Sequence, residues 1–130
     1  KLRLGAYGDP ASVPFNVWKA PLSLALGHTG YTHQIKHRNF DKRYLSICQV
    51  SADTPKQAIA YQKLGAKTFR VALDGDQLLD DEEICLSETV GTQCQDCLLC
   101  DGSKQNIAIA VHGSRKSKFK SKLIPIKAVA

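Results

Sequence analysis

The feature that most constrains this chain is a group of four cysteines within a polar stretch. Cys85, Cys94, Cys97 and Cys100 follow the spacing Cys-x8-Cys-x2-Cys-x2-Cys. The residues around them are acidic and polar, so this segment buries too little apolar surface to offset the entropy lost when it becomes ordered. We therefore expect a metal–thiolate centre, rather than a hydrophobic core, to hold the segment together.

The spacing of the thiolates narrows the choice of metal. Thiolates are soft ligands that favour zinc or iron–sulfur clusters, and structural zinc sites usually take two close pairs set well apart. Here three cysteines follow at two-residue intervals, as in the cluster-binding stretch of bacterial ferredoxins, and Cys85 closes the set. We predict a four-iron cluster (4Fe-4S), with zinc as the alternative and two disulfides after it.

Size and composition are those of an ordinary soluble domain. The 130 residues fit a single domain, and contents of 43% hydrophobic and 23% charged residues are typical of globular proteins. No apolar run approaches the roughly 18 residues of a membrane-spanning helix, so no membrane association is predicted. No secretory signal opens the chain, which favours a reducing cytoplasm, and Cys48 is interpreted as a small buried hydrophobe. The chain lacks an initiator Met, and we expect it to be a segment of something longer.

The net charge of +6 comes from the C-terminal end, where six basic residues and no acidic one follow Ser114. Such a tail attracts phosphates without reading sequence. It predicts nucleic-acid contacts at Arg115, Lys116, Lys118 and Lys120, with a solvated arm as the alternative. The predicted organisation is one domain over residues 1–114, including a metal-binding loop at 81–103, followed by a basic tail at 115–130.

Hydrophobic patterning predicts alternating strands and helices. Strands are expected over residues 2–7, 29–34, 44–50, 67–73 and 106–111, and helices over 13–26, kinked at Pro21, and 56–64. The clearest unit is the strand–helix–strand of residues 44–73, with Asp53 or Thr54 as the helix cap and Gly65 as the stop. The predicted fold class is α/β: parallel strand–helix units form a partial (half) TIM-like barrel or an open sheet, and the cysteine-rich metal loop is inserted into it.

In parallel α/β folds, ligands bind where strands end at their carboxyl side. Polar residues at the predicted strand ends give four candidate acid–base groups, Asp9, His33, Asp53 and His112, and Arg70 is a candidate anion contact. Each has a structural alternative. Asp9 suits a turn, Asp53 a helix cap, and the two histidines structural hydrogen bonds.

The ordered motifs resemble an uncharacterised family of bacteriophage and prophage proteins. The resemblance covers most of residues 2–114 and rests on the opening from Arg3 to Pro10, on Tyr31-Thr32-His33-Gln34, on Ser51-Ala52-Asp53 before a helix ending Leu64-Gly65, on the four cysteines with Asp101-Gly102, and on Val111-His112-Gly113. Members of that family typically carry further N-terminal sequence with more cysteines. Their strand–helix arrangement is similar to part of the barrel of radical-SAM enzymes, although this chain has no Cys-x3-Cys-x2-Cys signature.

These observations predict a phage-type metal-binding α/β protein whose reaction the sequence leaves open. A redox or radical-type enzyme fragment is one interpretation. The alternative is a non-catalytic, zinc-stabilised binding module, or a virion component, that contacts nucleic acid or a host protein. The expected location is the host cytoplasm, with the virion as the alternative.

Overall fold

The computed structural model describes residues 1–73 and 75–111 and has an α/β architecture with parallel strands. Its main sheet has five strands in the order β3-β4-β5-β7-β6, and every neighbouring pair is parallel. These strands are β3 (Tyr31–Thr32), β4 (Gln49–Ala52), β5 (Thr68–Ala72), β6 (Glu82–Ile84) and β7 (Asn106–Ala110). A second parallel pair joins β1 (Leu2–Arg3) to β2 (His28–Thr29). The predicted class, α/β with parallel strands, is confirmed.

Gly30 links the two sheets, because β2 and β3 are consecutive segments separated by this residue alone. The predicted strand 29–34 is therefore shorter and interrupted. A Cβ at Gly30 would stand 2.8 Å from the carbonyl oxygen of Ile47, so the close approach of the neighbouring chain requires glycine. The Gly30 amide donates to the carbonyl of Cys100 and its carbonyl accepts from Gln49, which places the cysteine segment against the junction.

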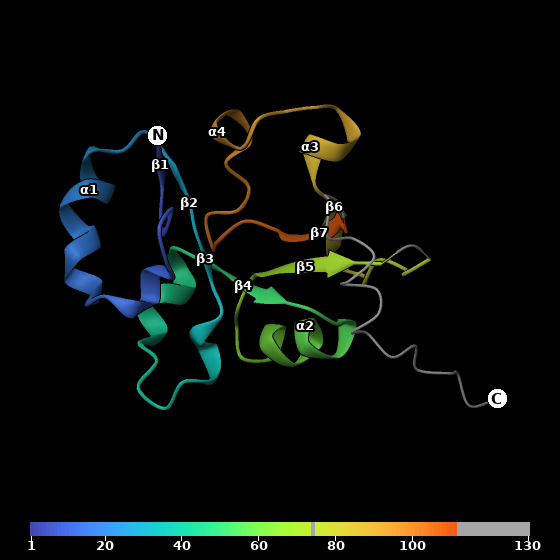
Figure 1. Ribbon diagram of the computed structural model, residues 1–130, viewed down its shortest axis with the longest axis horizontal. Helices are drawn as coiled ribbons and strands as arrows, with labels where there is room; N and C mark the ends of the chain where they lie inside the picture. The colour runs from blue at the N-terminus through green and yellow to red at the C-terminus, as the bar shows by residue number, and fades with distance from the viewer. Residues whose placement is uncertain (74, 112–130) are drawn as a thin grey trace.

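Two layers cover opposite faces of the main sheet (Figure 1). Helix α2 (Pro55–Gln62) covers one face, where Ala58 and Tyr61 pack with Val50 and Ala52 of β4. The cysteine segment, with α3 (Leu86–Thr89) and α4 (Cys94–Cys97), lies on the other side. Side chains alternate between the faces of a strand, so neighbouring residues of β4 serve different layers.

A second hydrophobic cluster lies beside the β1–β2 pair. Leu4, Tyr44, Ile47 and Cys48 are its buried members. The surrounding segments are α1 (Lys19–Leu24) and the 3-10 helices η1 (Pro10–Ser12), η2 (Phe15–Trp18) and η4 (Lys42–Ser46). The remaining 3-10 helix, η3 (Gln34–Lys36), packs Ile35 against the first cluster. The buried position predicted for Cys48 is confirmed, since its exposed fraction is 0%.

The strand–helix–strand unit of β4, α2 and β5 is confirmed, with parallel strands. Of the two cap candidates it is Thr54 that caps α2, because its side chain accepts from the Gln57 amide. Pro55 occupies the first turn, where its missing N–H costs nothing. Gly65 follows the helix with φ +86°, a conformation that favours glycine.

Three further boundary predictions were wrong. The predicted strand 44–50 begins only at Gln49, because the Asp41 carboxylate accepts from the Arg43 amide and starts η4 instead. The predicted helix 13–26 is divided into η2 and α1, since Pro14 and Pro21 remove two backbone donors. The first strand ends at Arg3, and Gly5, at φ +70°, turns the chain.

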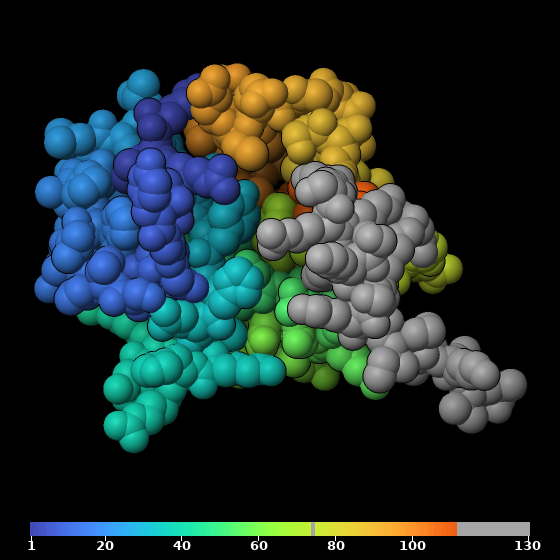
Figure 2. Space-filling model, in the orientation of Figure 1, coloured from blue at the N-terminus to red at the C-terminus, as the bar shows by residue number. Residues whose placement is uncertain are grey.

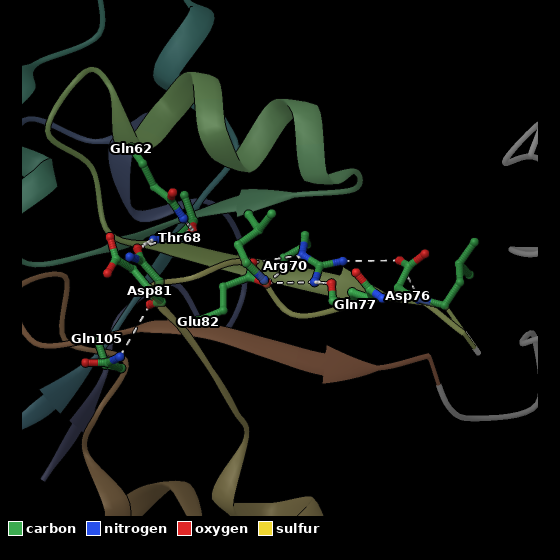
Figure 3. A network of polar contacts seen from close by, with 11 residues as sticks. Gln62, Thr68, Arg70, Asp76, Gln77, Asp81, Glu82 and Gln105 are labelled. Atoms are coloured by element: carbon green, nitrogen blue, oxygen red, sulfur yellow. Dashed lines mark hydrogen bonds and ion pairs between the residues drawn. The ribbon is translucent and has the colours of Figure 1, made fainter. Parts of the chain in front are cut away.

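Strand β6 was not predicted from the sequence, because Glu82 and Glu83 are poor strand formers. An ion pair explains how Glu82 can be buried at this edge of the sheet (Figure 3). The Nη2 of Arg70 lies 2.7 Å from a carboxylate oxygen of Glu82, and both side chains are 0% exposed. Arg70 also contacts Asp76 at 3.1 Å and donates to the Gln77 carbonyl.

This geometry corrects the prediction of Arg70 as an anion contact. The pKa of Arg70 is raised above its ordinary value, first by its hydrogen bonds to Glu82, so it stays a cation. Its guanidinium is enclosed and engaged by Glu82, Asp76 and Gln77, which leaves no exposed surface for an external anion. The buried charge therefore joins β5 to β6 rather than binding a ligand.

We expect the substitution Glu82→Gln to destabilise the fold by about 3 kcal/mol, because it leaves the buried Arg70 charge without its main counter-ion. Denaturant unfolding of the purified variant measures the loss. Glu83→Gln is the matched control, since Glu83 is the exposed neighbour in the same strand, and it is expected to change the free energy of unfolding by less than about 0.5 kcal/mol. Equal stabilities for the two variants would contradict the role given to the ion pair.

Candidate metal centre

All four clustered cysteines line a single cavity of about 370 Å³. The main sheet forms one wall through Tyr31, Ser51, Phe69 and Ile109, and Leu98 and Leu99 contribute apolar surface from the cysteine segment. The rings of Tyr31 and Phe69 meet edge to face at 4.8 Å. The cavity thus lies over a face of the sheet, on the side opposite α2, rather than only at the predicted rim of strand ends.

The local fold around Cys94, Cys97 and Cys100 directs them toward this cavity. Helix α4 is a single turn in which the Cys97 amide donates to Gln93 and the Leu98 amide to Cys94. Leu98 then has φ 53°, the left-handed conformation that ends the turn. Three residues after Cys97, the chain brings Cys100 back to the sheet, where its thiol is buried.

The backbone fixes the position of Cys100 from both sides. Its carbonyl accepts from Gly30 at 3.0 Å. Gly102, at φ +91°, packs directly on the backbone of Cys48, and any Cβ there would collide with the Cys48 amide nitrogen. Between them, the Asp101 carboxylate accepts from the amides of Ser103 and Lys104. A tight turn is therefore present at Asp101-Gly102, and it packs against the core at Cys48.

Cys85 reaches the cavity from the opposite end of the segment. It directly follows β6 and continues its pairing, because the Cys85 amide donates to Ala108 of β7 at 2.9 Å. Its Sγ lies 3.1 Å from the Ser87 hydroxyl. The sheet thus positions the first cysteine, and the turn at α4 positions the other three.

All five cysteines lie in the described part of the chain and all are free thiols. Burial raises the pKa of Cys100 to about 12, and the neighbouring Cys85, Cys97 and Cys94 act in the same direction. Tyr31 hydrogen-bonds to Cys100, and its own pKa is raised, first by burial and then by that thiol.

The separation of the cysteine side chains bears on which metal group they could hold. Among residues 1–73 and 75–111, no three His, Cys, Asp or Glu side chains are grouped closely enough to hold one metal ion. A single zinc ion would need all its sulfurs at about 2.3 Å from one point. An iron–sulfur cluster takes each thiolate on a different iron, so it suits sulfurs that surround a cavity.

Asp9 is positioned by a different part of the fold. Its carboxylate accepts from the Ala11 amide, from the Thr32 hydroxyl at 2.8 Å and from the His33 amide at 2.7 Å. These bonds use both oxygens and tie the start of η1 to the end of β3. The predicted meeting of Asp9 with the end of this strand is therefore found, and the contacts that it makes are structural.

Among the described rim residues, His33 contacts Asp9 through its backbone amide, and Asp53 lies apart from both. His33 is exposed and lines the cysteine cavity, whereas Asp53 is exposed beside α2, with its amide donating to Gln57. His112 and the tail residues Arg115, Lys116, Lys118 and Lys120 lie outside the described residues. Sequence reasoning missed Arg3 and Ser51 as cavity residues. Ser51 follows buried Val50 in the alternating pattern of a strand, which is the signal that assigns it to the opposite face.

Comparisons with known proteins found no matching family model, no matching curated protein and no matching solved structure. The described residues contain no helix that is long and apolar enough to cross a membrane.

The burial of the thiols predicts their reactivity in metal-free protein. A pKa of about 12 leaves Cys48 as a thiolate in only about one molecule in ten thousand at pH 8, and the side chain is enclosed. We expect iodoacetamide to modify the exposed Cys94 rapidly and Cys48 at least a hundredfold more slowly, as measured by peptide mass spectrometry. Modification of both at the same rate in folded protein would contradict the burial of Cys48.

Proposed function

We propose that this protein binds an iron–sulfur cluster through Cys85, Cys94, Cys97 and Cys100. The observation that carries the proposal is that all four thiols line the same cavity although 15 positions separate the first from the last. The acidic, polar composition of the segment supports the same conclusion, because metal binding would supply ordering energy that its side chains do not.

A cluster is supported over a zinc ion by the size of the cavity and the distribution of the thiols. The space of about 370 Å³ exceeds what one ion coordinated by four sulfurs requires, and the three cysteines at two-residue intervals have the ferredoxin-like spacing. Four thiolates would complete the coordination of either group and leave no open position for hydrolytic chemistry. The proposed activity is therefore electron transfer or another redox reaction.

A bound cluster would supply one-electron chemistry. The chain would contribute the rest: Tyr31 is placed to donate a hydrogen bond to the Cys100 sulfur, and the rings of Tyr31 and Phe69 would exclude water on the sheet side. Cys100 must lose its proton when it binds metal, against the effect of burial on its pKa. Loading is therefore expected to be weaker at low pH.

For the architecture, we propose the open sheet rather than the half barrel. In a barrel wall each new strand is added outside the previous one, whereas β7 here lies between β5 and the earlier strand β6. The cysteine segment is the crossover between these last two strands. Open α/β sheets also bind their ligands at the point where the strand order reverses.

The proposed biological setting follows the resemblance of the motifs to phage and prophage proteins. We propose that the protein works in the host cytoplasm, where free thiols persist. The basic tail is proposed to contact nucleic acid, with a host or virion protein as the alternative partner.

Metal analysis tests the proposed cluster. Protein purified without oxygen is expected to be brown, to absorb broadly near ~400 nm and to contain about four iron and four sulfide per chain. The substitution Cys97→Ser is expected to reduce the bound iron several-fold and to increase proteolysis of the segment 85–100, because an ordering ligand is lost. Elemental analysis and limited proteolysis measure the two effects.

Cys48→Ser is the matched control, since Cys48 is buried outside the cavity and should retain full iron content in the folded protein. A content of one zinc per chain and no iron would contradict the cluster and would support the zinc-stabilised binding module instead. Equal iron loss in both variants would show that the effect reports folding rather than ligation.

A further inference from the structure

Charge is divided between two parts of the chain. Residues 19–72 carry nine Lys or Arg and two Asp, whereas residues 74–101 carry nine Asp or Glu and no basic residue. Arg70 joins the two parts through its ion pairs with Asp76 and Glu82. The exposed charges lie on different elements, because α2 lies across the main sheet from the cysteine segment (Figure 1). In Figure 2 the teal segment around residue 40 projects at the bottom and the gold segment around residue 90 lies at the top. Basic residues therefore gather on the projecting segment and α2, away from the cysteine segment.

Five residues define what we term the basic face. Lys36, Arg38 and Lys42 come from the projecting segment, Lys56 and Lys63 from α2 and its end, and all five are exposed. Lys56 and Lys63 are seven residues apart and so lie on the same side of the helix. The Nζ of Lys36 lies 5.6 Å from the centre of the Tyr61 ring of α2, which places the two elements side by side.

The basic face is not neutralised by the chain itself. Within residues 1–73 and 75–111, none of its five cations forms an ion pair, and its one neighbouring pair joins Arg43 to Asp41 at 2.6 Å. Outside the face, Lys1 contacts Asp96 and Lys104 contacts Asp101. The positive potential of the basic face is thus open to an external polyanion.

We propose that the basic face binds the phosphate backbone of double-stranded nucleic acid without reading its sequence. Exposed lysines on flexible stems suit phosphates as point charges, and their spread over two elements suits a charged rod rather than a small anion. The aromatic rings beside the face, Phe40 and Tyr61, are not exposed. Unpaired bases would therefore find no stacking platform, which favours a duplex over a single strand.

This surface is separate from the proposed metal centre. Val50 and Ala52 of β4 point to the α2 side, while Ser51 between them lines the cysteine cavity. The acidic residues that surround the cysteines would repel a nucleic acid from that side. The binding of nucleic acid and the binding of metal are therefore expected to succeed or fail independently.

The test is the binding of the full chain to a short fluorescent duplex of arbitrary sequence over a series of salt concentrations. The variant Lys36→Gln, Arg38→Gln, Lys42→Gln removes three cations of the basic face. Because each phosphate contact contributes about 0.9 to the slope of log affinity against log salt, we expect the slope to fall by about 2 to 3 and the affinity to fall at least about tenfold at low salt.

The matched control, Lys1→Gln, Lys19→Gln, Lys104→Gln, changes the net charge by the same amount at exposed sites outside the face. It is expected to keep the wild-type slope to within about one. Equal losses in both triple variants would assign binding to net charge or to the tail and would overturn the proposal. The proposal would also be overturned if the protein bound poly-glutamate as tightly as the duplex, or bound a single strand more tightly than the duplex.

A check of the fold keeps the comparison valid. Thermal unfolding should show the same midpoint in both triple variants to within a few degrees, since all six positions are exposed. If the first variant unfolds, Lys56→Gln with Lys63→Gln provides a second test of the same surface, with an expected decrease of about 2 in the slope.

Discussion

Close backbone contact between the cysteine segment and the core is the constraint on which the rest of the structure depends. Gly30 and Gly102 are the contact points: the first donates to the Cys100 carbonyl, and the second lies directly on the backbone of Cys48. No side chain would fit at either position, so the sequence must supply glycine twice, 72 residues apart. These contacts hold the segment above the sheet and thereby create a cavity rather than a packed interface.

The position of strand β6 depends on the buried ion pair between Arg70 and Glu82. Strand β6 places Glu82 in a buried position at the edge of the sheet, and the buried charge of Arg70 makes this position tolerable for the carboxylate. Without that pair, the carboxylate would be desolvated with no counter-ion, and Cys85, which follows the strand, would lose its place beside β7. The structural ion pair and the candidate metal centre are therefore linked through three residues of one strand.

Sequence reasoning located what depends on local patterns and missed what depends on distant contacts. The unit β4–α2–β5 was predictable because Thr54, Pro55 and Gly65 mark the helix and apolar runs mark the strands. Strand β6 was not, since its burial rests on Arg70, twelve positions earlier. The cysteine motif identified the four candidate ligands, but Tyr31 and Ser51 enter the site only through strand register. Of the predicted strand-end residues, Asp9 ties η1 to β3, while Asp53 lies beside α2.

The alternation of side chains along β4 explains how one thin sheet can carry two different surfaces. Residues that point to one face pack α2, whose outer side is basic, and those that point to the other line the thiol cavity beneath an acidic segment. Negative thiolates and carboxylates gathered on one side would weaken any polyanion site placed beside them. Placing the lysines across the sheet increases the separation between the two charges, and the basic face keeps its potential even if the cysteine cavity gains a negatively charged cluster. Segregation of charge is thus the condition under which both proposed sites can operate in a chain of 130 residues.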